Sequence, residues 1–450
     1  MITSLGGVEY FERQCLAFLK NPQTNPQNEQ YIPGVFSYQE NKISFSFLVL
    51  GEIKEIHSLQ YQTLYIVDNT KRYTLYKLYD RIVLGHALGY PAPITLYYEW
   101  LFDDHIDPEM IKGERFVCRT NYLESFFTTK KHLLPDALFK VDESGCESYH
   151  EDNDKDFILQ SFYIQNDFLS QKYEKDKIKA RFNSLFSPKQ NRLLTYQFDL
   201  SLECNIIFET LEELALIAEA IKNFFVLIYA HSKFNIQIDY IQFKLSNKDI
   251  TAIKNTYKKD KKSIEIDSYG IAINFQQIDN FSVILEKWID FYIKDNRDFQ
   301  LASILDIINK KDPIIHLYLD MFVLISMIES FLKKPQQTKL HEKLSEFFKI
   351  SLSRTKCDQT KNYFNDNYQK DLIQQIVDCR NSLAHGRSLK LDTNKATDIS
   401  HAFIDFKQIV IEFFFGEIGL SGFITNNFGF LNKVKLRNPP KTEKITEPNR

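Results

Sequence analysis

Residues 379–386 are Cys-Arg-Asn-Ser-Leu-Ala-His-Gly, and they close a helical run that begins near Asp366. Apolar residues recur in this run at intervals of three and four, the period of one buried helix face. They are Leu372, Ile373, Ile376, Val377, Leu383 and Ala384. Gly386 follows as the left-handed stop that helix ends favour. The stretch therefore predicts an amphipathic helix packed against other helices.

A charged residue interrupts this apolar face, because Arg380 lies four residues after Ile376. Buried charges are stable only when they are paired. Glu329 stands on the apolar face of the preceding helix, four residues after Ile325. We therefore expect two packed helices on which Glu329 and Arg380 meet inside. A purely structural ion pair is the alternative interpretation of the same two residues.

The end of the helix carries the residue types of a phosphate site. Asn381 and His385 are four residues apart and share a helix face if the last turn holds. A guanidinium binds non-bridging oxygens, and an imidazole transfers protons near neutral pH. These groups suit cleavage of RNA through its own 2′-hydroxyl, although a histidine at a helix end also serves to satisfy carbonyls. Arg81 and His86 have the same spacing, but in a strand-rich region and without the asparagine.

Two parts of the chain carry a family resemblance. Residues 380–386, Arg-Asn-Ser-Leu-Ala-His-Gly, preceded by Met-Ile-Glu-Ser-Phe at 327–331, resemble the HEPN superfamily, specifically the ApeA-like HEPN proteins of bacterial anti-phage defence. Residues 34–38, 43–47 and 51–53 look like the opening β region of those proteins. The resemblance implies an α+β fold class, with a mostly antiparallel β or mixed N-terminal region followed by an all-α HEPN helical bundle.

The resemblance also implies a function. Such a protein is a metal-independent endoribonuclease of abortive infection, whose active site forms where two HEPN bundles pair and which leaves a 2′,3′-cyclic phosphate. By position, Arg380 and His385 are the catalytic pair, Asn381 a supporting residue and Glu329 the acid on the preceding helix. The implied substrate is RNA, with tRNA anticodon loops as the candidate, and the N-terminal region is a sensor of a phage-derived trigger. The alternative is a catalytically silent HEPN module that binds nucleotide or RNA, or senses a phage protein.

Two further cations near the motif have two interpretations. Lys333 lies one turn beyond Glu329, and Arg387 follows Gly386. Both are candidates for binding flanking RNA phosphates, but we favour the interpretation that they are surface charges.

The pattern along the chain predicts several regions. Residues 1 to about 30 are polar, with an arm or loop at 21–29. Alternating apolar residues from Val35 to Phe126 predict short strands of an antiparallel sandwich or barrel. Strands at 194–207 and 236–243 flank a helix that starts with a capping box at 210–213. Helices are expected near 297–309, 313–333, 338–351, 366–385 and 393–416.

These patterns give the expected domain limits. They are a β-rich domain at 1–141, an α+β subdomain at 157–295, the HEPN bundle at 296–432 and a disordered basic tail at 433–450. Asp142 to Asp156 is an acidic stretch between the first two, either a metal site or, as we favour, a solvated linker. Basic clusters at 172–181 and 254–262 suit RNA backbone contact or, as we favour, solvated turns.

Composition sets further limits. The formal net charge of the 450 residues is −3, so the protein as a whole does not attract nucleic acid electrostatically. Any binding of RNA must therefore depend on a local group of cations. Six cysteines occur without a C-x-x-C pair or a zinc-like cluster with histidine, which predicts reduced thiols in the cytoplasm. Cys379 is either a redox handle beside Arg380 or a small buried neighbour, and we favour the second. No signal peptide, membrane span, cofactor or metal is expected.

Overall fold

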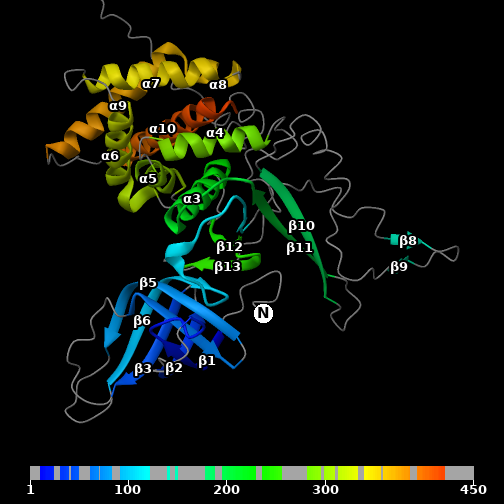
Figure 1. The fold of residues 1–450 in the computed structure, drawn as a ribbon. Coiled ribbons are helices and arrows are strands. Elements are labelled where there is room, and N and C mark those ends of the chain that lie inside the picture. Colours follow the sequence, from blue (N-terminus) through cyan, green and yellow to red (C-terminus); the bar gives the residue numbers. More distant parts are fainter. Residues whose placement is uncertain are drawn as a thin grey trace, which may run out of the picture. The chain divides into compact units, whose positions relative to one another are not determined.

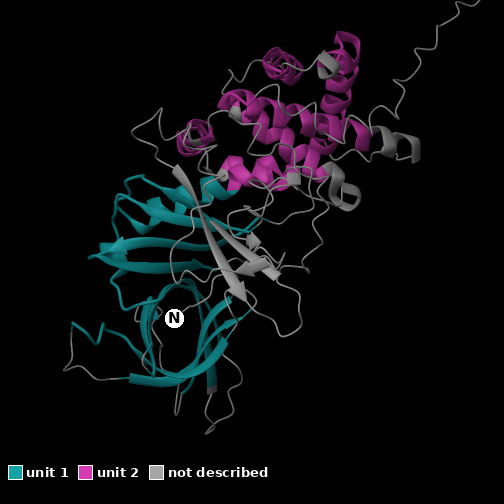
Figure 2. Ribbon diagram, turned by 90° about the vertical axis from the view of Figure 1, so that its right-hand side faces the viewer, with its two compact units in different colours: residues 1–222, 235–265 teal, residues 223–234, 266–450 magenta. Residues whose placement is uncertain are grey.

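Antiparallel strands followed by helices give this chain an α+β fold, described from a computed structural model (Figure 1). The structure describes residues 11–24, 31–39, 42–49, 61–69, 71–83, 92–121, 139–141, 147–149, 178–187, 195–229, 236–255, 281–294, 298–309, 313–332, 339–355, 358–385 and 393–420. Two compact units are present (Figure 2): unit 1 holds residues 1–222 and 235–265, and unit 2 holds residues 223–234 and 266–450.

Six strands of unit 1 close into a barrel. Their order is β6-β3-β2-β1-β4-β5, and β5 pairs again with β6 to complete the ring. All of these pairings are antiparallel. The strands are β1 (Phe11–Phe18), β2 (Tyr31–Gln39), β3 (Lys42–Val49), β4 (Thr63–Asp68), β5 (Lys71–Val83) and β6 (Ala92–Phe102).

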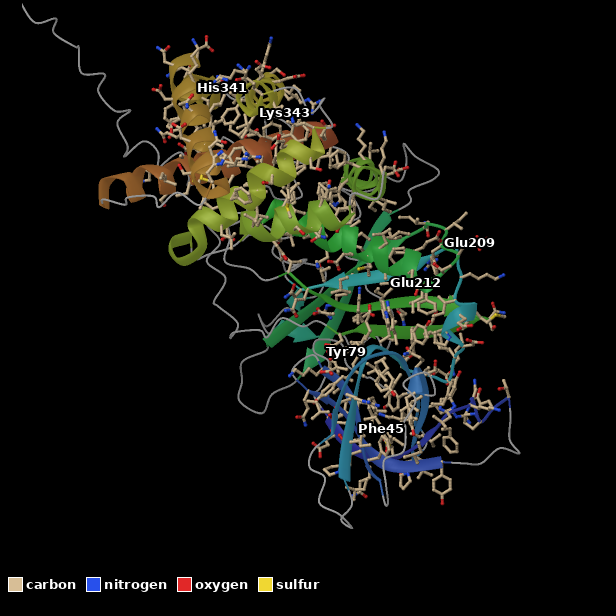
Figure 3. All side chains as sticks on the ribbon, turned by 90° about the vertical axis from the view of Figure 1, so that its left-hand side faces the viewer. Phe45, Tyr79, Glu209, Glu212, His341 and Lys343 are labelled. Atoms are coloured by element: carbon tan, nitrogen blue, oxygen red, sulfur yellow. The ribbon has the colours of Figure 1, made fainter. Side chains whose placement is uncertain are left out.

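Alternate side chains fill the barrel interior. On β3 and β6 the buried positions are Ile43, Phe45, Phe47, Ile94, Leu96 and Tyr98, with polar or less buried residues between most of them. This is the period of two that a strand with one apolar face requires. Figure 3 labels Phe45 among the barrel side chains. The strands expected at these residues are therefore confirmed, and the choice left open between sandwich and barrel is decided by the β5–β6 pairing.

Strand β6 also belongs to the rest of the sheet. Residues 92–98 pair with β3, whereas residues 100–102 pair with β13 (Lys248–Lys254). At the change of partner, the carbonyl of Glu99 accepts the N–H of Asn255 at 2.7 Å, and its carboxylate lies 3.0 Å from Nζ of Lys77. The sheet continues through β12 (Ile238–Leu245), β7 (Phe116–Thr120), β11 (Thr195–Cys204) and β10 (Ile178–Ser187). A separate pair is formed by β8 (Phe139–Val141) and β9 (Glu147–Tyr149).

Helix α3 (Leu211–Ile228) begins at the predicted capping box. The hydroxyl of Thr210 accepts the N–H of Glu213 at 3.2 Å, and the Glu213 carboxylate accepts the N–H of Glu209 at 2.7 Å. These bonds satisfy N–H groups that a helix start leaves without partners. The capping interaction is confirmed, with the return bond made one residue earlier than the motif specifies.

The described residues of unit 2 form helices (Figure 1). After the last part of α3 come α4 (Phe281–Ile293), α5 (Asp298–Asn309), α6 (Pro313–Phe331), α7 (Leu340–Arg354), α8 (Asp358–Tyr363), α9 (Asp366–Ala384) and α10 (Thr393–Ile418). Helix α10 contacts α4, α6, α7 and α9, so it is the common packing partner of this unit.

Helix α10 buries polar side chains as well as apolar ones. Asp405, Gln408 and Glu412 are spaced by three and four residues, and each is at most 3% exposed. The Asp405 carboxylate accepts hydrogen bonds from the hydroxyls of Tyr363 and Tyr368. The Gln408 amide donates to Oε1 of Glu412 at 3.2 Å, whereas Oε2 of Glu412 has no hydrogen-bond partner among the described residues. Burial raises the pKa of Glu412 to about 7.

Several predictions from the sequence need correction or stay open. Strand β1 lies within the stretch of residues 1 to about 30 that was described as polar and for which no strand was predicted, and helices α4 and α8 were not predicted either. The five predicted helices are present as α5, α6, α7, α9 and α10. Strand β7 pairs with β11 and β12, so the sheet runs across the predicted limit between 141 and 157, and the domain division remains a prediction. The tail at 433–450 lies outside the described residues.

The close contact at Gly34 leads to a prediction for the barrel. A Cβ at this position would lie 2.5 Å from the Phe45 ring and 2.5 Å from the Ser46 carbonyl oxygen. Gly34→Ala should therefore lower the free energy of unfolding of the barrel by about 1–3 kcal/mol. Urea unfolding, followed by the fluorescence of Trp100 in a Trp288→Phe background, would measure this. An exposed change on the same strand, Gln39→Ala, is the control, and equal stability of the two variants would contradict the contact.

The buried carboxyl of Glu412 leads to a prediction for unit 2. Because its pKa is about 7 in the folded protein and near 4.5 when unfolded, the unfolded chain loses this proton first as pH rises. Stability should therefore fall between about pH 4.5 and 7, by at most about 3 kcal/mol. Glu412→Gln should remove this fall and unfold at higher urea than wild type at pH 8. Fluorescence of Trp288 in a Trp100→Phe background is the readout, and an unchanged pH profile would contradict the burial.

Candidate active site

One carboxylate joins three helices of unit 2. Glu329 lies on α6, and its Oε1 accepts a hydrogen bond from Nζ of Lys343 on α7 at 3.0 Å. Its other oxygen, Oε2, lies 3.6 Å from Nη2 of Arg380 on α9. The expected approach of Glu329 and Arg380 is therefore present, although the side chains are 25% and 32% exposed and so not fully inside.

The two cations share this carboxylate unequally. The contact to Lys343 has the length of a hydrogen bond, whereas the 3.6 Å contact to Arg380 is longer than one. The Nε of Arg380 is buried and has no hydrogen-bond partner among the described residues. Two cations and one carboxylate have a formal net charge of +1. Because Arg380 makes the longer contact with Glu329, its guanidinium is the less fully compensated of the two cations. An anion with oxygen acceptors is the ligand that such a group binds best.

Helix packing explains why Arg380 is held in place. On α9 the residues Leu372, Ile373, Ile376 and Cys379 are buried against neighbouring helices. Asn365 caps the start of this helix, because its side chain accepts the N–H of Tyr368 at 3.0 Å. Arg380 therefore continues a fixed face, and its guanidinium emerges where that face reaches solvent.

His385 lies at the end of the same helix. It is the C-cap residue, and its N–H donates to the carbonyl of Asn381 at 3.1 Å. The side chains of both residues are exposed. The predicted helix end is confirmed, whereas Gly386, expected to stop the helix, lies outside the described residues.

Helix geometry separates Arg380 from His385. Five residues correspond to about 140° around an ideal helix, whereas Asn381 and His385 are only about 40° apart. Within one chain, Asn381 and His385 thus share the exposed side, and Arg380 belongs to the packed side. The arginine and the histidine of one copy do not share a helix face.

Other predicted site residues fall outside the described part of the chain. Lys333 and Arg387 are among them, as is His86 of the second motif-like spacing, while Arg81 lies on β5. No cluster of three or more metal-binding side chains occurs among the described residues, and the acidic stretch 142–156 is described only at β9. In the same described part, no helix has both the length and the apolar character needed to cross a bilayer.

Sequence reasoning missed Lys343. It lies one position before Leu344 and four before Phe347, both of which are buried, so it is a charge on the apolar face of its helix. The same pattern singled out Arg380 and Glu329, and it applies equally to α7. A systematic search for charges on apolar helix faces would have found it.

Comparisons with family models, with curated proteins and with solved structures gave no match for the chain.

Cys379, beside Arg380, leads to a prediction about reactivity. The side chain is buried, and burial raises the pKa of its thiol to about 11. In a Cys146→Ser/Cys357→Ser variant, the four remaining cysteines are Cys15, Cys118, Cys204 and Cys379, all of them buried. The folded variant should not react with Ellman's reagent at pH 8, and all of these thiols should react in guanidinium. Rapid reaction that is lost in Cys379→Ser would instead support a redox handle.

Proposed function

We propose that this chain is a metal-independent HEPN-type endoribonuclease of anti-phage defence that acts in the cytoplasm. It cleaves RNA through attack of the 2′-hydroxyl on the adjacent phosphorus, and the N-terminal β region senses a phage-derived trigger. The candidate substrate is tRNA, whose anticodon loop presents unstacked bases for selective cutting.

The observation that carries the proposal is the incompletely compensated guanidinium of Arg380. Its one contact with a described carboxylate is 3.6 Å long, and one of its buried nitrogens has no described partner. A phosphate in the transition state of cleavage gains negative charge on its non-bridging oxygens, which a nearby arginine stabilises. A guanidinium already in a tight bidentate pair would have little to offer such a group.

His385 supplies the proton transfer. Its exposed imidazole takes the proton from the 2′-hydroxyl while the new O2′–P bond forms. The P–O5′ bond breaks, and the leaving 5′-oxygen needs a proton from a second group. The products are a 2′,3′-cyclic phosphate and a 5′-hydroxyl.

A second copy of the chain provides this second group. A single imidazole does not readily act as base for the 2′-hydroxyl and as acid for the 5′-oxygen in the same step. The separation of about 140° around the helix also keeps Arg380 and His385 of one copy from facing the same phosphate. Two copies that pair along the ends of α9 would supply two arginines and two histidines. A homodimer, or a larger assembly of such dimers, is therefore part of the proposal.

A second function has its own support. The contacts of Glu329 with Lys343 and Arg380 join three helices, so the charges are also accounted for as a structural network. In that case the bundle is a catalytically silent module that binds RNA or a partner protein.

RNA cleavage by purified protein separates the two functions. Wild type, incubated with total tRNA and with phage extract as activator, should cut tRNA in EDTA and leave ends that ligate only after the cyclic phosphate is removed. Arg380→Ala and His385→Ala should each lower the rate by about 100-fold or more, because each removes one part of the transition-state stabilisation. Sequencing of RNA ends after induced expression in cells gives the cleavage position.

Two matched controls come from the same unit. Arg354 on α7 pairs with Glu417, and His341 is an exposed histidine on α7 labelled in Figure 3. Arg354→Ala and His341→Ala should cleave at the wild-type rate. Intact tRNA with wild type, both in vitro and in cells, would refute the nuclease. Cleavage that persists in the Arg380 and His385 variants would move the site elsewhere, and loss of cleavage in EDTA would indicate a metal nuclease.

A further inference from the structure

Lys343 is an unusual residue for its position. Its side chain is only 6% exposed, although it carries a charge, and it lies in the first turn of α7. The positive end of the helix dipole opposes a cation there, and Lys339 at the N-cap makes no side-chain capping bond. The buried ammonium therefore depends on Glu329 for its compensation.

Glu329 consequently pairs more closely with Lys343 than with Arg380. Its contact of 3.0 Å with Lys343 is a hydrogen bond between charged groups, the stronger class of such bonds. The remaining carboxylate oxygen meets Arg380 only at 3.6 Å, without a hydrogen bond. Without Lys343, nothing described would hold the carboxylate away from Arg380, and a tight pair between the two would neutralise the guanidinium.

We infer that Lys343 is a positioning residue, which holds Glu329 so that Arg380 stays available to an RNA phosphate. The inference rests on the proposed function, because it assigns Arg380 to phosphate binding. It adds that the affinity of the site for RNA is set by a competition between two cations for one carboxylate. Lys343 acts through Glu329 and does not itself touch the RNA.

The competition predicts an unusual pattern among variants. Lys343→Met removes the ammonium, so Glu329 pairs fully with Arg380 and the local charge falls from +1 to zero. Adding Glu329→Gln removes the competing carboxylate and restores a charge of +1 at Arg380. A purely structural role for the triad would predict no such rescue, because the double variant retains neither of the ionic contacts.

Binding of total tRNA in a His385→Ala background tests this without cleavage. Relative to that background, Lys343→Met should weaken binding about 10-fold and make the slope of log K against log salt shallower by about one, since one phosphate contact is lost. The Lys343→Met/Glu329→Gln double variant should bind within about 2-fold of the background. Lys343→Arg, which keeps the charge, should also bind like the background.

The controls keep a folding defect apart from the proposed effect. Arg354→Met breaks another ion pair of α7, with Glu417, and should leave binding unchanged. If Lys343→Met does not fold, Lys343→Gln takes its place: it keeps a hydrogen-bond donor near Glu329 but loses the charge, and it should weaken binding in the same way. Thermal melting of every variant reports its folding.

The outcomes distinguish this inference from the proposed function. Unchanged binding in Lys343→Met, or equally weak binding in the single and double variants, would overturn the positioning role while cleavage by wild type still stands. Absence of both tRNA binding in the His385→Ala background and cleavage by wild type would overturn the proposed function and the inference together.

Discussion

Glu329 is the constraint on which the candidate site depends. It is a single carboxylate that faces one cation from α7 and another from α9. Partly buried charges are costly to leave unpaired, so the three side chains add to the apolar contacts that hold their helices together. Because two cations face one carboxylate, one positive charge is in excess. The contacts that join the three helices therefore also leave a cation without a full counter-charge.

Polar burial elsewhere in unit 2 follows a different rule. Oδ2 of Asp405 accepts hydrogen bonds from two tyrosine hydroxyls, which are neutral donors. Burial raises the pKa of Tyr368, which keeps that hydroxyl a donor throughout the physiological range. Oδ2 of Asp405 thus accepts from neutral hydroxyls, whereas the Glu329 carboxylate faces two cations.

Local patterns in the sequence were informative wherever one face of an element is buried. The alternation at residues 43–47 and 94–100 gave strands of the barrel, and the capping box gave the start of α3. Strand β1 was not predicted because its two buried residues, Cys15 and Ala17, are small and give a weak apolar signal. Helix α4 was also missed, although its sequence carries the signal. Polar residues recur every four positions at Ser282, Glu286 and Asp290, and the buried Leu285, Trp288, Ile289 and Tyr292 lie between and after them.

Closure of the barrel could not be predicted, since it depends on pairing between β5 and β6, which local patterns do not encode. The site divides in the same way. The motif and its charged neighbour on α6 were visible as charges on apolar faces, and their approach was expected. The unequal sharing of Glu329 was not, because it depends on a third helix and on contact lengths that no spacing in the sequence determines.

The position of α10 along the chain has a consequence during synthesis. This helix follows Glu329, Lys343 and Arg380 in the sequence, yet it is the packing partner shared by α4, α6, α7 and α9. A polypeptide leaves the ribosome N-terminus first, so the earlier helices emerge before the one that they pack around. Until then α6, α7 and α9, which carry the charged triad, can make their contacts with one another but not those with α10. Burial of the faces of α4, α6, α7 and α9 that α10 covers therefore waits for the last described helix of the chain.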